Sequence, residues 1–76
     1  MEITTEDYTD QQKALGAQVR KQRHAIGMTQ DVLSEKCGIY RTYLSRIEGG
    51  TANPTLLVLG ALADSLHVDL CDLFRE

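Results

Sequence analysis

The chain has 76 residues and a formal net charge of −3, with 42% apolar and 25% charged residues, which fits one soluble globular domain with a small core. No stretch approaches the roughly 20 apolar residues that a membrane-spanning helix needs. The acidic, polar start MEITTEDYTD lacks the basic and apolar regions of a secretory signal, so we expect a cytoplasmic protein with no membrane partner.

The first predicted helix spans about residues 10–25. Thr9 and Gln12 fit a capping box, in which each side chain satisfies a free backbone donor at the helix start. Three apolar residues are spaced to share one buried stripe: Leu15, Val19 and Ile26. Residues before Thr9 show no apolar period, so we predict a mobile acidic tail over residues 1–8 and a single folded domain over residues 9–76.

Two short helices follow, separated by a tight turn. Thr29 is predicted to cap a helix over residues 30–37, and Gly38 to end it. A third helix over residues 40–48 comes almost at once and ends at a pair of glycines.

A fourth helix is predicted to begin with Asn53 as its cap and Pro54 in its first position. Its buried face is predicted to carry Leu56, Leu59, Leu62, Ala63 and Leu66. Asp69 is predicted to cap a fifth helix, with three apolar residues: Leu70, Leu73 and Phe74. No segment alternates apolar and polar residues for the length of a strand, so the predicted fold class is all-α with five helices.

Charge is distributed unevenly along the chain. Residues 1–12 hold four acids and no base, residues 13–53 hold seven bases and three acids, and residues 54–76 hold four acids and one base. The field at a contact surface depends on where charges sit, so a negative total charge does not exclude a DNA partner. Such clustering is also typical of an ordinary solvated face.

The segment from Gln30 to Ile47 carries the most information. Its two short helices are joined by a glycine turn, and the small residue Ser34 lies where the second helix must come close. This pattern predicts a steeply packed helix pair whose second helix can enter a DNA major groove.

Three motifs accompany this segment: TQ at residues 29–30, SRIE at 45–48, and NPT at 53–55 followed by leucines. In combination they resemble the lambda-repressor-like, or Xre, helix-turn-helix family, over roughly Leu15 to Phe74. The RTYLS at residues 41–45 also resembles controller proteins of restriction–modification systems. The resemblance implies a transcriptional regulator that binds double-stranded DNA at a palindromic operator.

The resemblance implies seven DNA-contacting residues: Gln30, Tyr40, Arg41, Thr42, Tyr43, Ser45 and Arg46. Gln30 would meet a phosphate at a helix N-terminus, and the arginines would read guanine edges. Two roles are equally favoured for Tyr43: contact with a DNA phosphate, or packing into the core. The family also implies a structural ion pair between Arg23 and Glu48.

Three features depart from the family pattern: the acidic tail before Thr9, which has no assigned role, and two single positions. Tyr40 stands where a small capping residue is usual, and a tyrosine cannot cap, which leaves the start of the third helix less defined. His67 stands where glycine commonly ends the fourth helix, so it must adopt a strained backbone or the helix must end differently.

The fourth and fifth helices carry more apolar groups than one small core can cover, and exposed apolar patches commonly become interfaces. We therefore expect a homodimer whose contact is formed mainly by Leu57, Val58, Leu70 and Phe74. A two-fold dimer would set two recognition helices about 34 Å apart, on successive major grooves.

The same residues bear on two other classes of function. A module whose main ligand is another protein, such as an antitoxin, remains the alternative. An enzyme is not expected, because His24 and His67 have no nucleophile partner at a recognisable spacing, and no metal site, cofactor or small-molecule ligand is indicated. Cys37 and Cys71 are interpreted as partly buried apolar residues, with a disulfide as the less favoured possibility.

Overall fold

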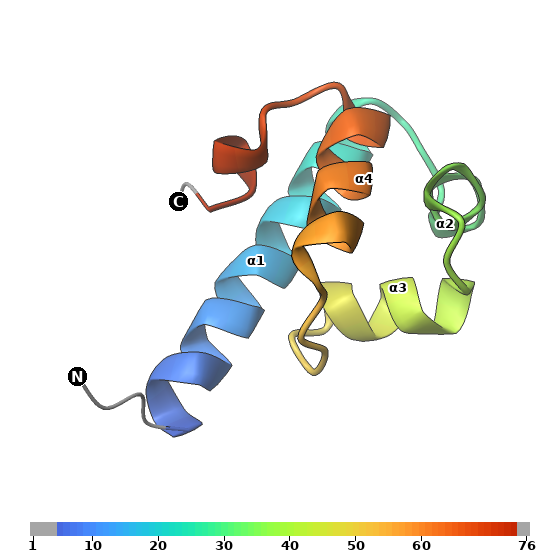
Figure 1. The fold of residues 1–76 in the computed structure, drawn as a ribbon. Helices are drawn as coiled ribbons and strands as arrows, with labels where there is room; N and C mark the ends of the chain where they lie inside the picture. The colour runs from blue at the N-terminus through green and yellow to red at the C-terminus, as the bar shows by residue number, and fades with distance from the viewer. Residues whose placement is uncertain (1–4, 75–76) are drawn as a thin grey trace.

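A computed structural model describes residues 5–74 of the chain, with side chains from residue 9 onward. Four α-helices are followed by one short 3-10 helix (Figure 1): α1 Thr5–Ala25, α2 Gln30–Cys37, α3 Arg41–Glu48, α4 Leu56–Leu66 and η1 Leu70–Phe74. The all-α prediction is confirmed, but the predicted fifth helix is a 3-10 element, so the α-helices number four in this range. None of them is long and apolar enough to cross a bilayer.

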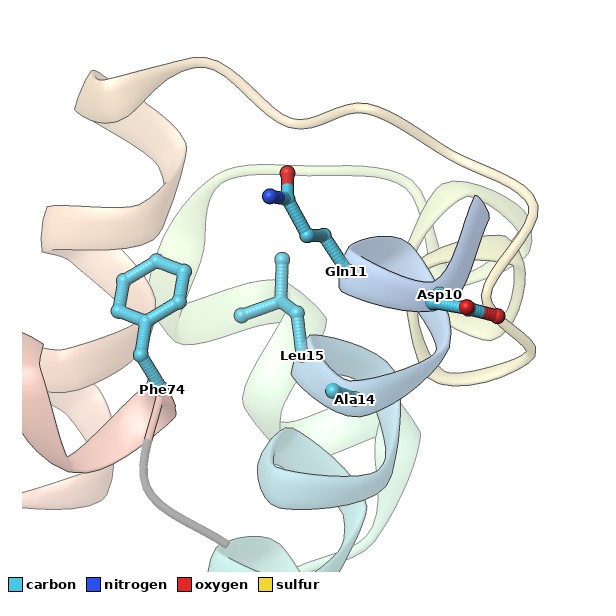
Figure 2. A pocket seen from close by; sticks show the side chains of 5 residues that line it. All are labelled: Asp10, Gln11, Ala14, Leu15 and Phe74. Carbon is cyan, nitrogen blue, oxygen red and sulfur yellow. The ribbon is translucent and has the colours of Figure 1, made fainter. Parts of the chain in front are cut away.

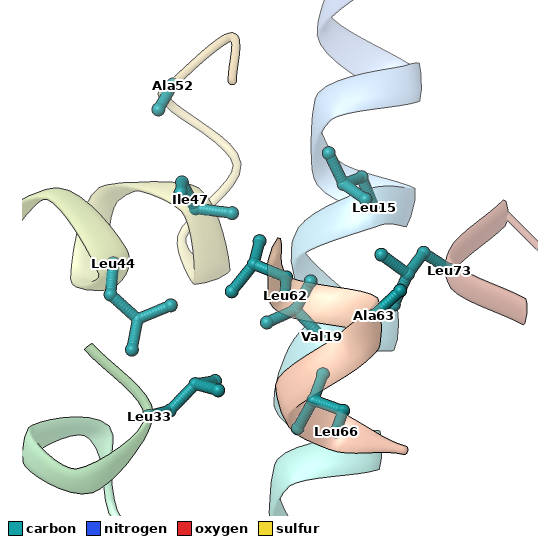
Figure 3. Packing of buried hydrophobic residues seen from close by; sticks show 10 residues of the cluster. All are labelled: Leu15, Val19, Leu33, Leu44, Ile47, Ala52, Leu62, Ala63, Leu66 and Leu73. Atoms are coloured by element: carbon teal, nitrogen blue, oxygen red, sulfur yellow. The ribbon is translucent and has the colours of Figure 1, made fainter. Parts of the chain in front are cut away.

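The core lies where all five elements meet. Helix α1 packs against α3, α4 and η1, while α2 packs against α3 and α4. Figure 3 shows the buried side chains converging from every element and from the loop before α4: Leu15, Val19, Leu33, Leu44, Ile47, Ala52, Leu62, Ala63, Leu66 and Leu73. Because aliphatic side chains from both α2 and α3 point into this cluster, the hydrophobic effect fixes the two helices relative to the rest of the domain.

Helix α1 begins earlier than the sequence predicted. It starts at Thr5 instead of Asp10, so Thr9 and Gln12 lie inside the helix and the predicted capping box is wrong. Residues 1–4 of the predicted tail lie outside the described residues. Gly27 takes a positive φ of 66° just after the helix, as its predicted end requires, which leaves Ile26 outside the helix and 46% exposed instead of on the buried stripe.

Helix α4 begins later than predicted. Its N-cap is Thr55, whose Oγ1 accepts a hydrogen bond from the Val58 N–H at 3.2 Å, so neither Asn53 nor Pro54 starts the helix. The physical reason is that Ala52 and Pro54 are buried, and the loop must pack inward before the helix can begin. Leu56 therefore lies on the exposed side, contrary to prediction.

The end of α4 shows the strained option that the sequence left open. His67 adopts a left-handed conformation with φ 59° and ψ 39°, and its N–H bonds to the last turn of the helix. A non-glycine residue takes this conformation at a steric cost.

The two cysteines differ in environment. Cys37 is half-buried, with Sγ 3.5 Å from Ser65 Oγ, whereas Cys71 is exposed, so the prediction of partial burial holds for Cys37 alone. Burial raises the pKa of the Cys37 thiol, an effect that the hydrogen bond with Ser65 only partly offsets.

Candidate nucleic-acid interface

The turn between α2 and α3 is built by the residues that the sequence singled out. Thr29 caps α2 by accepting a hydrogen bond from the Val32 N–H at 3.2 Å. Gly38 ends α2 in the left-handed region at φ 70°, and the Ile39 N–H donates to the Ser34 carbonyl at 3.0 Å. Together these features form the Schellman motif that commonly ends an α-helix. The predicted bounds of α2 are confirmed.

Helix α3 is held by its apolar side and by a close approach to α1. Leu44 and Ile47 are buried in the core. At Gly16 of α1, an added Cβ would lie only 2.3 Å from the carbonyl oxygen of Ile47 and 2.7 Å from that of Glu48. Only glycine allows α1 to pass this close to the end of α3, so Gly16 sets how deeply α3 seats against α1.

The opposite side of α3 faces outward. Its exposed side chains include Arg41, Thr42, Ser45 and Arg46. At about 100° per residue, these four positions lie within an arc of roughly 140° on the side away from the core. The polar residues that were predicted to read bases thus share one exposed face.

The two tyrosines near α3 occupy different environments. Tyr40 precedes the helix, makes no side-chain capping bond, and is 84% exposed, so the helix itself starts at Arg41. Tyr43 is half-buried and packs against the core cluster. Of the two interpretations of Tyr43, packing is therefore the one with an observed contact.

Both arginines of the exposed face have weak partners within the chain. The Arg41 Nε lies 3.5 Å from Asp31 Oδ1 at the start of α2, and both side chains are more than half exposed. The Arg46 Nη2 lies 3.4 Å from the Thr51 carbonyl oxygen. Exposed contacts of this length are worth about 1 kcal/mol or less, so either guanidinium is available to a nucleotide.

Glu48 accepts hydrogen bonds from two other elements at the far end of α3. Arg23 of α1 donates to it from Nε and Nη2, each at 2.8 Å, and also donates from Nη1 to the Met28 carbonyl at 2.9 Å. The Gln30 amide donates to Glu48 Oε1 at 3.2 Å. The carboxylate therefore links α1, the start of α2 and α3.

The Arg23–Glu48 ion pair is almost fully enclosed, with side chains only 9% and 4% exposed. The hydrogen bonds to Glu48 raise the pKa of Arg23 above its ordinary value, against the opposing effect of burial. Such a pair is geometrically demanding, so it fixes where the end of α3 lies.

The four residues predicted to form a dimer contact are not equally exposed. Leu57 is 84% exposed and Phe74 is 58% exposed, whereas Val58 and Leu70 are half-buried against the core. Leu57 lines a shallow hollow along α4. Phe74 lines a different one, where it faces Leu15 and Gln11 of α1 (Figure 2).

The comparison with known families decides the classification. The helix-turn-helix domain family matches residues 14–74, which is most of the chain and includes every element that positions α3. The chain belongs to the helix-turn-helix family.

Three relatives show what this helix-turn-helix protein is similar to. It is 36% identical over 64 residues to an uncharacterized HTH-type transcriptional regulator, y4dJ, of Sinorhizobium fredii, covering 80% of this chain and 83% of the relative. The crystal structure of the restriction–modification controller protein C.AhdI from Aeromonas hydrophila is 30% identical, with a TM-score of 0.81 over 83% of this chain and 96% of that one. The hypothetical transcription factor NHTF from Neisseria is 29% identical, with a TM-score of 0.82 over 99% of this chain and 84% of that one. The predicted resemblance is confirmed, and the family is one of DNA-binding transcriptional regulators.

Two residues of this region were not recognised from the sequence. Gly16 sits in the middle of a helix, where nothing local reveals which backbone will cross it. Asp31 looks like an ordinary first-turn acid, and its proximity to Arg41 arises only once α2 and α3 are packed. The roles of both residues arise only from the tertiary structure, so the sequence alone does not reveal them.

Proposed function

We propose that this protein is a cytoplasmic, sequence-specific transcriptional regulator that binds a palindromic DNA operator as a homodimer. The observation that carries the proposal is the outward face of α3, where Arg41 and Arg46 are exposed while Leu44 and Ile47 anchor the opposite side of the helix in the core. Each arginine can donate two hydrogen bonds to a guanine edge in the major groove. Thr42 and Ser45 lie on the same face and are suited to bases or phosphates.

Phosphate contacts would come from the start of α2. The first N–H groups of a helix have no partner within the helix and attract anions. Gln30, the first residue of α2, uses one amide hydrogen on Glu48 and keeps a second amide hydrogen for a phosphate. We propose that Tyr40, which is exposed beside α3, adds a hydroxyl contact to the DNA backbone.

The dimer is proposed on the apolar surface of the C-terminal elements. Leu57 and Phe74 would form the contact, and the half-buried Val58 and Leu70 would support them from beneath. A two-fold axis through this surface would place two copies of α3 about 34 Å apart, the repeat of successive major grooves.

The decisive experiment is to sequence duplexes that the purified protein selects from a random pool. We expect an inverted repeat whose half-sites lie about one helical turn apart. Pools selected by Arg41→Ala and by Arg46→Ala should each lose the preference at one position of each half-site. Absence of any enriched sequence would overturn the proposal, and enrichment of a single unrepeated site would overturn the dimer.

A second candidate is a partner-binding module of the same fold, of the antitoxin type. The exposed Tyr40 and the hollow beneath Phe74 favour it, because both offer aromatic surface to another protein. A stoichiometric partner that remains bound through purification, together with no duplex binding at low salt, would select this candidate over the first.

A further inference from the structure

An acidic residue lies beside one of the proposed base-reading arginines. Asp31 is in the first turn of α2, and its Oδ1 lies 3.5 Å from the Nε of Arg41, the first residue of α3. The carboxylate is 82% exposed and the arginine side chain 52% exposed, so neither is buried by the fold. The contact therefore contributes little to folding.

The geometry of the guanidinium gives this contact a consequence. Arginine donates from Nε on one side and from its two Nη groups at the tip. A carboxylate at Nε occupies the side and leaves the tip available for the N7 and O6 acceptors of guanine. It also restricts the rotation of a long side chain, so less conformational freedom is lost when the base is bound.

The Asp31 carboxylate acts in a second way. Held beside the carboxylate, the guanidinium cannot easily turn to another acceptor when the guanine is replaced, so its Nη donors are left unpaired in the groove. Unpaired donors weaken the incorrect complex more than the correct one, and this increases specificity.

We propose that Asp31 is a positioning residue that determines specificity: it holds the Arg41 guanidinium by Nε, directs the two Nη groups toward a guanine, and disfavours complexes in which that guanine is missing. The inference rests on the proposed function, since it assumes that α3 reads DNA. It assigns to an acid of α2 a role in discrimination, although the acid need not touch a base itself.

The test compares Asp31→Asn with Glu35→Gln, which removes the same charge from an exposed position one turn further along α2. Binding is measured at fixed salt to the selected duplex and to the same duplex with the guanine opposite Arg41 replaced. For Asp31→Asn we expect the preference between these duplexes to fall by about twofold to fivefold, because an exposed contact worth about 1 kcal/mol or less can change the preference by no more than that. Glu35→Gln should tighten binding to both duplexes equally and leave the preference unchanged.

A double variant separates positioning from a general charge effect. In an Arg41→Ala background, Asp31→Asn should no longer change the preference, because the side chain that it positions is absent. Asp31→Glu should restore part of the preference, and thermal melting should show that all variants remain folded. An unchanged preference in Asp31→Asn, or an equal loss with and without Arg41, would overturn the inference. If the wild-type protein itself preferred no duplex, the proposed function would fail first.

Discussion

Arg23 and Glu48 lie 25 residues apart in the chain and meet in a two-point ion pair, with Nε 2.8 Å from Oε2 and Nη2 2.8 Å from Oε1. Both side chains are nearly inaccessible to solvent. The pair joins α1 to the end of α3 and therefore determines how α3 is held.

Removing one partner of this pair should destabilise the domain strongly. Glu48→Ala leaves the Arg23 guanidinium enclosed without its counter-charge, and we expect the free energy of unfolding to fall by about 3–5 kcal/mol. Urea denaturation measures the change. Arg20→Ala, an exposed arginine of the same helix, is the matched control and should shift stability by no more than about 0.5 kcal/mol. Equal effects of the two substitutions would show that the ion pair has no structural role.

Gly16→Ala should be destabilising even though alanine favours helices. The new Cβ would collide with the carbonyl oxygens of Ile47 and Glu48, which are backbone atoms that cannot move independently. We expect a loss of about 1–3 kcal/mol, as for other overpacked sites. Gly60→Ala in α4 is the control, because a Cβ there meets no atom within 4 Å. That variant should gain up to about 1 kcal/mol from helix propensity, and a similar gain at Gly16 would contradict the close approach.

Arg46→Ala should change the choice of DNA site more than the stability of the fold. Its side chain is exposed, and its contact with the Thr51 carbonyl is long. If Arg46 reads a guanine, its loss should cost about 1–3 kcal/mol on the preferred duplex and much less on a random one. Fluorescence anisotropy with both duplexes makes the comparison. Equal weakening on both duplexes would reduce Arg46 to a phosphate contact.

Self-association should depend on Leu57. A charged side chain at this exposed position should prevent an apolar contact without disturbing the core, so Leu57→Glu should sediment as a monomer and keep the helical circular dichroism of the wild type. Its melting temperature should fall to that of the isolated protomer, because a partner no longer stabilises the folded state. Phe74→Glu tests the second predicted contact in the same way. Lys36→Glu, on the exposed surface of α2, provides the charge-change control. A Leu57→Glu protein that sediments like the wild type would remove this surface from the proposed interface.

The Cys37 thiol should react slowly and with a shifted pH dependence. In a Cys71→Ser variant, Cys37 is the only cysteine of the chain. Because its pKa is raised by burial, its thiolate fraction at neutral pH is smaller than that of a free thiol. The rate of alkylation should therefore keep rising at pH values where a free thiol, with a pKa of about 8.5, has reached its plateau. A pH profile that matches free cysteine would contradict the burial of this group.

The sequence predicted the bounds of a helix best where its capping residues were consistent with the burial of the neighbouring residues. Thr29 and Gly38 mark α2 at both ends, and nothing nearby competes with them. At α4 two capping residues were available, and Thr55 was used instead of Asn53 because the intervening loop packs into the core. The sequence did not predict the early start of α1 at Thr5, because residues 5–8 show no apolar periodicity.

The sequence predicted which residues form the exposed face of α3, but it did not predict the contacts between side chains on different helices. The outward residues of α3 followed from helical periodicity and from the family resemblance, and their exposure agrees with that prediction. The contacts of Gln30 with Glu48 and of Asp31 with Arg41 link residues 18 and ten positions apart on separate helices. Local sequence patterns do not encode such pairs, because they depend on the crossing of packed helices.

The two ends of α3 are not held equally firmly by the rest of the domain. Its C-terminal end is fixed by Glu48 and by the approach at Gly16, whereas Tyr40 at its beginning supplies no capping side chain. Substitutions at the beginning of this helix can therefore accumulate with little penalty to folding. Homologous proteins with this architecture could therefore change their DNA target through a few substitutions at the beginning of α3, while the rest of the fold is retained.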